Sequence, residues 1–222
     1  MPLLLRTPDF LKRLRQLSER TPFEFPADAI PSHFRRAGVL IPFWEEAGQI
    51  RVLLTERAAH LSGHPGQVSF PGGRLEAGES WEQAAVREAY EEVGIDPARV
   101  EVLGRLDDAW SGAGHHLVPV VAWLEGTPHF EANPGEVAKL LMPRVADLLR
   151  PEARSEEEVQ HRGTRYLNQI LEWPGGRVYG LSTDLLLEVL AWASGGEPNR
   201  GPVRLQEMHT FMDLAPSSGG AS

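Results

Sequence analysis

The chain has 222 residues, of which 41% are apolar and 24% are charged, as is ordinary for a soluble globular protein with one elaborated domain. Its formal net charge of −9 argues against non-specific nucleic-acid binding, which needs a basic surface. No apolar run approaches the length of a membrane span, and the absence of cysteine excludes disulfides, thiol nucleophiles and Cys-ligated zinc. We therefore expect a cytoplasmic protein with no nucleic-acid or membrane partner.

Apolar spacing before residue 75 indicates one helix and three short strands. The helix carries Phe10, Leu14 and Leu17 on one side. Two later apolar runs flank a turn and predict a hairpin, and successive glycines at Gly72 and Gly73 are expected to end the third strand. The ranges are a helix over 8–20, a Pro-rich extended segment over 21–31, strands over 38–44, 50–55 and 67–70, and a polar loop over 56–66.

A helix with clear signals at both ends is predicted from Trp81. Ser80 is a good N-cap residue, and Gln83 three residues later completes a capping-box pattern. Gly94 suits the position just after a helix, and Pro97 prevents continuation. We therefore expect the helix to end at about residue 93.

The C-terminal half of this helix carries Glu88, Glu91 and Glu92 on one helical side. Like charges this close destabilise an isolated helix by about 0.2–0.5 kcal/mol per pair. A hard cation reverses that cost, because Mg²⁺ and Mn²⁺ prefer oxygen ligands. Glu88 and Glu92 border the buried stripe of the helix, which favours fixed ligands over a solvated acidic face.

The second half of the chain predicts further strands of the same core and an apolar helix near the C-terminus. An acidic loop leads into a segment with helical apolar spacing, and the last eight residues are small and polar, which is typical of disorder. The ranges are strands over 100–106, 117–124, 166–173 and 177–179, an acidic loop over 131–136, a helix from about 137, a turn or short helix over 143–149, an exposed charged excursion over 150–163, and a helix over 183–193.

The stretch around the central helix resembles the signature of the Nudix hydrolases. Gly73, Glu79, the pair Arg87-Glu88, the pair Glu91-Glu92 and Gly94 occur at its spacing, and only Ala89 is smaller than the usual aliphatic residue. The resemblance implies an α/β fold, the Nudix α/β/α sandwich with a mixed β-sheet, and hydrolysis of a diphosphate joined to another moiety. We accordingly divide the chain into an N-terminal helix and lead-in over 1–34, a Nudix domain over 35–200 and a partly disordered tail over 201–222. A homodimer is plausible for this fold, although no sequence feature demands one.

The same resemblance implies a metal centre with Mg²⁺ or Mn²⁺ as the cofactor. Glu88 and Glu92 look like the principal ligands, Glu91 is a further ligand or bridge, and the Gly73 carbonyl is an additional one. Arg87 would orient these carboxylates.

The general base is left open between three carboxylates, Glu79, Glu88 and Glu136. Glu79 is implied to lie near the metal or its bound water. Glu136, in the stretch Asn133-Pro-Gly-Glu136, is where this fold often brings a carboxylate from a late loop. Its other interpretation is a glutamate at a helix start, stabilised by the helix dipole.

The segment before the signature resembles that of the coenzyme A diphosphatases (CoA pyrophosphatases), whose products are 3′,5′-adenosine bisphosphate and 4′-phosphopantetheine. We therefore predict that Arg57, Gly72 and Gly73 contact the diphosphate of a CoA-like nucleotide. Ala58 and Ser62 depart from the pattern, since serine and arginine are usual there. The matching residues are Leu53, Leu54, Thr55, Arg57, Gly66, Val68, Phe70, Pro71, Gly72 and Gly73.

Two alternatives remain open. One, which Ala58 and Ser62 keep open, is a Nudix hydrolase for ADP-ribose or a dinucleotide. The other, from a different class, is a catalytically silent Nudix domain that binds a ligand, although such a domain should have lost carboxylates and none is missing here. His60 and His64 in the loop before the signature could touch a phosphate or a metal, but an exposed loop histidine without a role is the simpler interpretation.

Overall fold

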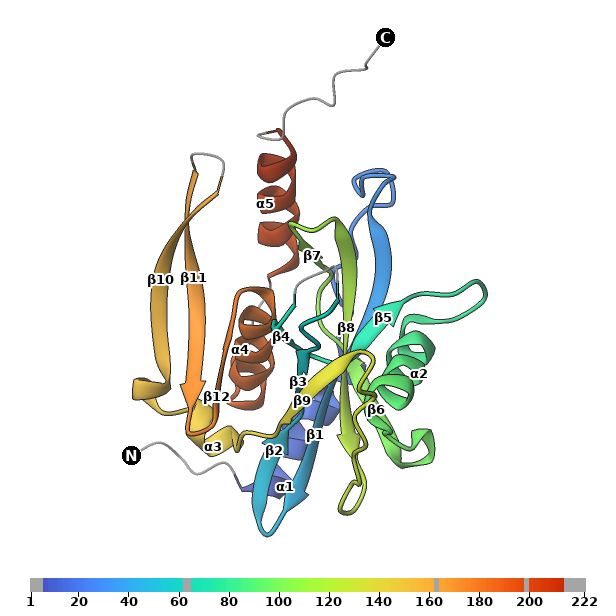
Figure 1. The fold of residues 1–222 in the computed structure, drawn as a ribbon, viewed down its shortest axis with the longest axis vertical. Coiled ribbons are helices and arrows are strands. Elements are labelled where there is room, and N and C mark those ends of the chain that lie inside the picture. Colours follow the sequence, from blue (N-terminus) through green and yellow to red (C-terminus); the bar gives the residue numbers. More distant parts are fainter. Residues whose placement is uncertain (1–5, 62–64, 162–163, 198–199, 214–222) are drawn as a thin grey trace.

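The computed structural model describes residues 6–61, 65–161, 164–197 and 200–213. Its central layer is a six-stranded mixed sheet (Figure 1). Four strands follow the order β2-β1-β8-β6, while β5 pairs with β1 and β7 pairs with β8. β1 and β8 are parallel, and the other pairs are antiparallel. The bounds are β1 Arg35–Glu46, β2 Gln49–Val52, β5 Gly72–Arg74, β6 Val100–Arg105, β7 Ala109–Ser111 and β8 His115–Leu124.

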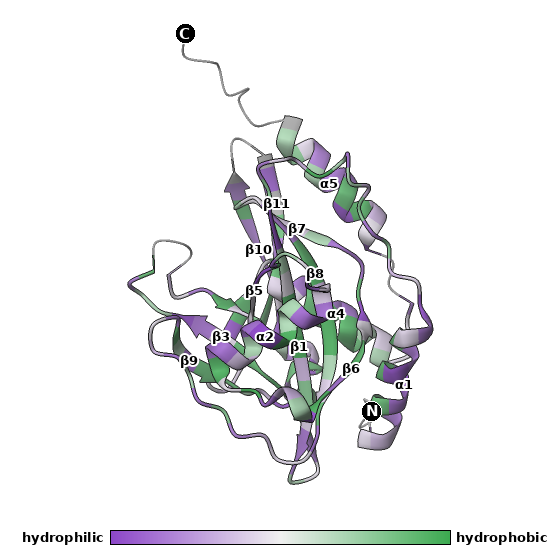
Figure 2. Cartoon of the chain, turned by 90° about the vertical axis from the view of Figure 1, so that its right-hand side faces the viewer, coloured by the Kyte–Doolittle hydropathy of each residue, from purple (hydrophilic) through white to green (hydrophobic). Residues whose placement is uncertain are grey.

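Helices cover both faces of this sheet, because successive residues of β1 point to opposite sides. Leu40 packs in one core with Ala85 of α2. Ile41 packs in the other core with Phe10 of α1 and Leu186 of α4. Figure 1 shows α2 and α4 on opposite sides of the sheet, and in Figure 2 hydrophobic residues gather in the strands at the centre of the molecule. This arrangement confirms the expected α/β/α sandwich with a mixed sheet. The helices are α1 Thr7–Arg15, α2 Trp81–Val93, α3 Val145–Leu148, α4 Leu181–Ala193 and α5 Gly201–Asp213.

Two smaller sheets flank the sandwich. The first has the order β4-β3-β9, so the predicted strand over 50–55 is divided at Leu53 between the central sheet and this one. The second has the order β10-β11-β12, and its β10–β11 hairpin extends along one side of the molecule (Figure 1). The bounds are β3 Leu54–Arg57, β4 Val68–Ser69, β9 Val137–Leu141, β10 Arg154–His161, β11 Thr164–Trp173 and β12 Gly176–Tyr179.

The segment from residue 137 is a strand, so our prediction of a helix there is wrong. Val137, Leu140 and Leu141 have helical spacing, but this segment pairs with β3, with Leu141 beside Leu54. Helix propensity is a weak preference that such tertiary pairing overrides.

Gly72 and Gly73 lie in β5 rather than in a turn, which corrects a second prediction. Gly72 pairs with Val39 of β1, and a Cβ added at Gly72 would lie 2.5 Å from the carbonyl oxygen of Gly38. The glycine therefore serves close approach of two strands.

Two further differences concern the second half of the chain. The charged excursion over 150–163 contains β10, whose side chains are mostly exposed but whose backbone pairs with β11. Residues 201–213 form α5, which the sequence did not predict, and residues 214–222 lie outside the described part of the chain. The N-terminal helix, the first hairpin, the other strands and the helix over 183–193 are confirmed within a few residues. In the part of the chain that the structure describes, no helix is long and apolar enough to cross a membrane.

Candidate active site

The local sequence places α2 closely against β1. Ser80 accepts a hydrogen bond from the backbone N–H of Gln83, whose side chain accepts from the N–H of Ser80, and Gly94 ends the helix in the left-handed conformation. These features confirm the predicted caps. A Cβ added at Gly38 of β1 would lie only 2.7 Å from the carbonyl oxygen of Trp81, so the missing side chain lets the helix approach the sheet.

Two carboxylates of α2 lie directly against the backbone of β5. The Gly72 N–H donates to Glu92 Oε2 at 3.1 Å. A Cβ added at Gly73 would lie 2.4 Å from the carboxylate carbon of Glu88, so only glycine leaves room for that carboxylate. The glycines and glutamates of the signature are thus neighbours in space as well as in sequence.

Glu92 is only 5% exposed, and burial raises the pKa of its carboxyl group to about 7. The negative charges of Glu136 and Glu88 act in the same direction on this pKa. The Gly72 N–H and the positive charge of Arg57 oppose them. Glu92 therefore interacts with four predicted site residues, which come from β3, β5, α2 and the loop before β9.

Glu88 is partly buried, and burial is the main reason why its pKa is raised. Hydrogen bonding to Arg87 lowers this pKa, whereas the charges of Glu91 and Glu136 raise it. Glu88 and Glu92 thus both feel the charge of Glu136, so the loop before β9 comes close to the C-terminal half of α2.

Arg87 is the centre of a hydrogen-bond network that holds three of the carboxylates. Its Nε donates to Glu79 Oε1 at 2.7 Å. Its Nη1 donates to Glu88 Oε1 at 2.9 Å and to Glu91 Oε2 at 3.3 Å. Its Nη2 donates to the carbonyl oxygen of Arg74 at 2.8 Å and to Glu79 Oε2 at 3.2 Å. One planar guanidinium therefore connects the loop before α2, the helix itself and β5.

The side chains of Glu79 and Glu91 are less buried than those of Glu88 and Glu92. The pKa of Glu79 is lowered, first by its hydrogen bond to Arg87 and then by the backbone N–H of Glu76. The side chain of Glu91 is 52% exposed, so among these carboxylates it contributes least to a buried cluster.

Glu136 is the last residue of the loop between β8 and β9, and it directly precedes a strand. Its interpretation as the first residue of a helix is therefore wrong. The backbone N–H of Ala58 donates to the carbonyl oxygen of Glu136 at 2.9 Å, which ties this loop to the segment that carries Arg57.

The donor set fits a divalent cation, because buried carboxylates lie beside further acidic groups. Within the described residues, however, no three acidic or histidine side chains already stand in a metal-binding arrangement. Glu88 and Glu91 share one nitrogen of Arg87, and Glu92 is held by Gly72. A bound ion would draw these oxygens together against those contacts.

Sequence reasoning missed the Arg74 carbonyl and Asn133. Nothing in the sequence indicates the Arg74 carbonyl, because a backbone acceptor carries no residue signal. Asn133 had a signal, since Asn-Pro-Gly is typical of a turn in which the Asn side chain bonds the backbone two residues on. Ser62 and His64 lie outside the described residues, and His60 Nε2 lies 3.1 Å from the carbonyl oxygen of Gly135.

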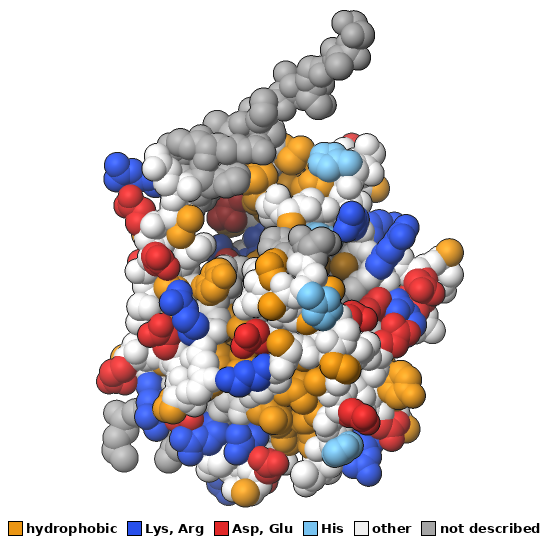
Figure 3. Space-filling view, viewed as in Figure 1, with side chains coloured by type: hydrophobic (Ala, Val, Ile, Leu, Met, Phe, Trp, Pro, Cys, Tyr) orange, Lys and Arg blue, Asp and Glu red, His pale blue; other side chains and the backbone are white. Residues whose placement is uncertain are grey.

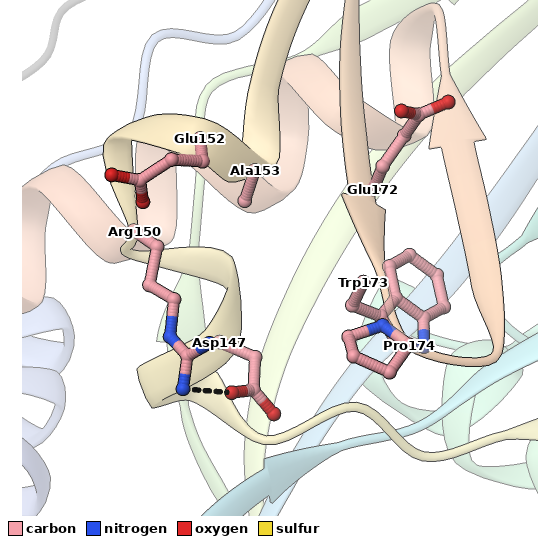
Figure 4. A pocket seen from close by; sticks show the side chains of 7 residues that line it. All are labelled: Asp147, Arg150, Glu152, Ala153, Glu172, Trp173 and Pro174. Carbon is pink, nitrogen blue, oxygen red and sulfur yellow. Dashed lines mark ion pairs between the residues drawn. The ribbon is translucent and has the colours of Figure 1, made fainter.

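The surface itself does not mark this site. On the face shown in Figure 3, acidic and basic side chains are interspersed. A surface hollow of about 240 Å³, shown in Figure 4, lies between α3 and the end of β11 and contains none of the predicted site residues. Its walls include Arg150, paired with Asp147, and Trp173. The buried carboxylates, and not this hollow, therefore define the candidate site.

Comparison with known proteins agrees with this geometry. The family model described as "NUDIX domain" matches residues 34–163. The chain belongs to the Nudix family. The Arabidopsis thaliana protein "Nudix hydrolase 15, mitochondrial" is 34% identical over 172 residues, which cover 73% of this chain and 60% of that protein. The "Uncharacterized Nudix hydrolase NudL" of Enterobacter sp. (strain 638) is 36% identical over 165 residues, which cover 74% of this chain and 85% of that protein.

Solved structures give a weaker likeness. The Caenorhabditis elegans Ap4A hydrolase in a binary complex is 22% identical with a TM-score of 0.43, and the match covers 51% of this chain and 82% of that one. The Nudix family is therefore shown by sequence, whereas this structural likeness supports no conclusion about substrate. This chain spans only 60% of the length of the Arabidopsis relative.

Proposed function

We propose that this Nudix protein is a metal-dependent diphosphatase whose substrates are coenzyme A and its derivatives. The observation that carries the proposal is the burial of Glu92, beside Glu88, against the backbone of Gly72 and Gly73. A buried carboxylate next to a second one is costly unless a proton or a cation compensates the charge.

Mg²⁺ or Mn²⁺ is the cation we propose, with Glu88 and Glu92 as principal ligands and with Glu91 and the Gly73 carbonyl as further ones. When bound, such an ion neutralises the diphosphate and lowers the pKa of a coordinated water. Oxygen donors at partly buried positions suit a hard divalent ion.

Arg87 acts by positioning the carboxylates. Its five hydrogen bonds hold Glu79, Glu88 and Glu91 at once. Lysine could not replace it, because a single ammonium group lacks the planar fork. Glu79 is kept ionised by Arg87 and lies at the loop–helix junction, where it can accept a hydrogen bond from water.

Arg57 is proposed to bind the diphosphate, and Glu136 is proposed to be the general base. The charge of Arg57 acts on Glu92 and that of Glu136 acts on both Glu88 and Glu92, so both groups lie beside the proposed metal centre. Glu136 would accept the proton of the attacking water, while Arg57 would hold the anionic substrate in line for attack.

The proposal that coenzyme A is the substrate rests on the segment from Leu53 to Gly73. The segment supplies β3, β4 and β5, and it therefore borders the carboxylates. Ala58 is only 4% exposed, so the serine that is usual at this position would also be buried. Having alanine instead of serine here therefore removes no contact that a surface side chain would make to the substrate. We also propose a cytoplasmic homodimer, which cell fractionation and sedimentation would test.

A substrate panel tests this proposal. Purified protein with Mg²⁺ or Mn²⁺ is offered coenzyme A, ADP-ribose, NADH and diadenosine polyphosphates, and the products are separated by chromatography. We expect coenzyme A to give 3′,5′-adenosine bisphosphate and 4′-phosphopantetheine only when metal is present. Faster hydrolysis of ADP-ribose than of coenzyme A would contradict the assignment of coenzyme A as the substrate. Tight binding of one of these compounds without any hydrolysis would favour a silent ligand-binding domain.

A further inference from the structure

The loop between β8 and β9 is bonded to the end of α2. The Glu131 N–H donates to the carbonyl oxygen of Val93 at 3.0 Å. The Asn133 N–H donates to the carbonyl oxygen of Glu92 at 2.8 Å. The loop that leads to Glu136 is therefore attached to the backbone of a proposed metal ligand.

Asn133 also organises the turn that carries Glu136. Its side-chain Oδ1 accepts a hydrogen bond from the Gly135 N–H at 3.0 Å. Its carbonyl oxygen accepts from the N–H groups of Glu136 at 3.0 Å and Val137 at 2.8 Å. A side chain that bonds the backbone two residues on fixes a turn in this way.

The opposite side of the turn is held by the segment that follows Arg57. The Ala58 N–H donates to the Glu136 carbonyl oxygen at 2.9 Å, and His60 Nε2 lies 3.1 Å from the Gly135 carbonyl oxygen, to which its N–H can donate. The turn is thus fixed between α2 and the proposed substrate-binding segment, with Glu136 at the junction.

We infer that Asn133 is a positioning residue. Its side chain fixes the turn that carries Glu136 beside Glu88 and Glu92, so that Glu136 is aligned for the proton transfer. The inference rests on the proposed function and adds to it a residue that does not itself touch substrate. Small displacements of a base reduce turnover more than binding, because alignment matters most in the transition state.

The chain offers a matched control at the same end of α2. Asp96 Oδ1 accepts from the Ala98 N–H at 3.0 Å, which is the same bond between a side chain and the backbone two residues on. This turn does not carry Glu136, and Asp96 has no place in the proposed site. Asp96→Ala therefore removes an equivalent bond without disturbing the base.

The test compares wild type with Asn133→Ala, Asn133→Asp and Asp96→Ala on the best substrate of the panel. We expect Asn133→Ala to lose about tenfold in kcat, with KM and Mn²⁺ affinity changed less than about twofold. Asn133→Asp keeps the acceptor oxygen and should restore most of kcat. Asp96→Ala should keep kcat, with a loss of melting temperature similar to that of Asn133→Ala.

Full kcat in Asn133→Ala, or an equal loss of kcat in Asp96→Ala, would overturn the inference. If Asn133→Ala does not fold, Gly135→Ala disturbs the same bond, since its methyl group would lie 3.2 Å from Asn133 Oδ1, and the same loss of kcat is expected.

Amide hydrogen exchange separates this inference from the proposed function. We expect the Gly135 and Glu136 amides to exchange faster in Asn133→Ala than in wild type, and not in Asp96→Ala. Unchanged exchange would refute the role of Asn133 whatever the substrate. A wild-type protein that hydrolyses none of the panel would instead refute the proposed function.

Discussion

Replacing Glu92 by glutamine should stabilise the metal-free protein, and the gain should depend on pH. The folded-state pKa of Glu92 is raised from 4.5 to about 7, so the fold favours the protonated carboxyl group. Stability from this group is fully present below pH 4.5 and is lost as pH rises through 7. Glutamine keeps an acceptor oxygen for the Gly72 N–H but never ionises. Because one pKa unit corresponds to about 1.4 kcal/mol, the variant should gain roughly 3 kcal/mol at pH 8 and little at pH 4.5.

Urea unfolding in the presence of a chelator, from pH 4.5 to 8.5, measures this difference. For a chain of this size the gain corresponds to a rise in melting temperature of roughly 6–12 °C at pH 8. Glu91→Gln removes the same charge from a half-exposed position on the same helix and controls for net charge. Adding Mn²⁺ should reverse the order, because only wild type gains the full stabilisation by ligand binding. Unfolding free energies of wild type and Glu92→Gln that run parallel across this pH range would refute the reasoning.

Three further substitutions test the other groups of the site. Gly73→Ala would place a methyl group 2.4 Å from the carboxylate carbon of Glu88, which would displace that carboxylate. Mn²⁺ titration should therefore show at least about a tenfold loss of affinity, while the circular dichroism spectrum stays unchanged. Arg87→Lys should lower kcat by about a hundredfold, because lysine cannot hold Glu79 and Glu88 together, and wild-type kinetics would contradict this network. Glu136→Gln should lower kcat by about a hundredfold or more while Mn²⁺ affinity stays the same. A loss of Mn²⁺ affinity instead would assign Glu136 to the metal.

Local signals predicted α2 well because its ends are encoded in the chain itself. Ser80, Gln83 and Gly94 act within one turn of the helix, so their effects do not depend on distant partners. The strand over 137–141 was mistaken for a helix because its structure depends on β3, which is about eighty residues away in sequence. The same dependence explains why β5 was missed, since it pairs with β1. β10 pairs with the adjacent β11 and was missed for another reason: its charged, mostly exposed sequence carries no apolar alternation.

In the candidate site, too, the local features were predictable from the sequence and the features that depend on distant segments were not. The spacing of Glu88 and Glu92 predicted two neighbouring carboxylates, but the extent of Glu92 burial depends on β5 and could not be inferred. The resemblance to the Nudix signature likewise implied that Arg87 orients the carboxylates, without indicating that it also binds the backbone of Arg74. Contacts made to backbone carbonyl groups leave no trace in a sequence, because every residue carries one.

Mn²⁺ binding by wild type and Glu92→Gln, measured by electron paramagnetic resonance at pH 8, tests the proposed metal centre most directly. Wild type should remove the signal of free Mn²⁺ at stoichiometric protein concentration. Glu92→Gln should bind the ion at least about a hundredfold more weakly while it remains folded. Equal Mn²⁺ affinity in the two proteins would contradict the assignment of the buried carboxylates as metal ligands.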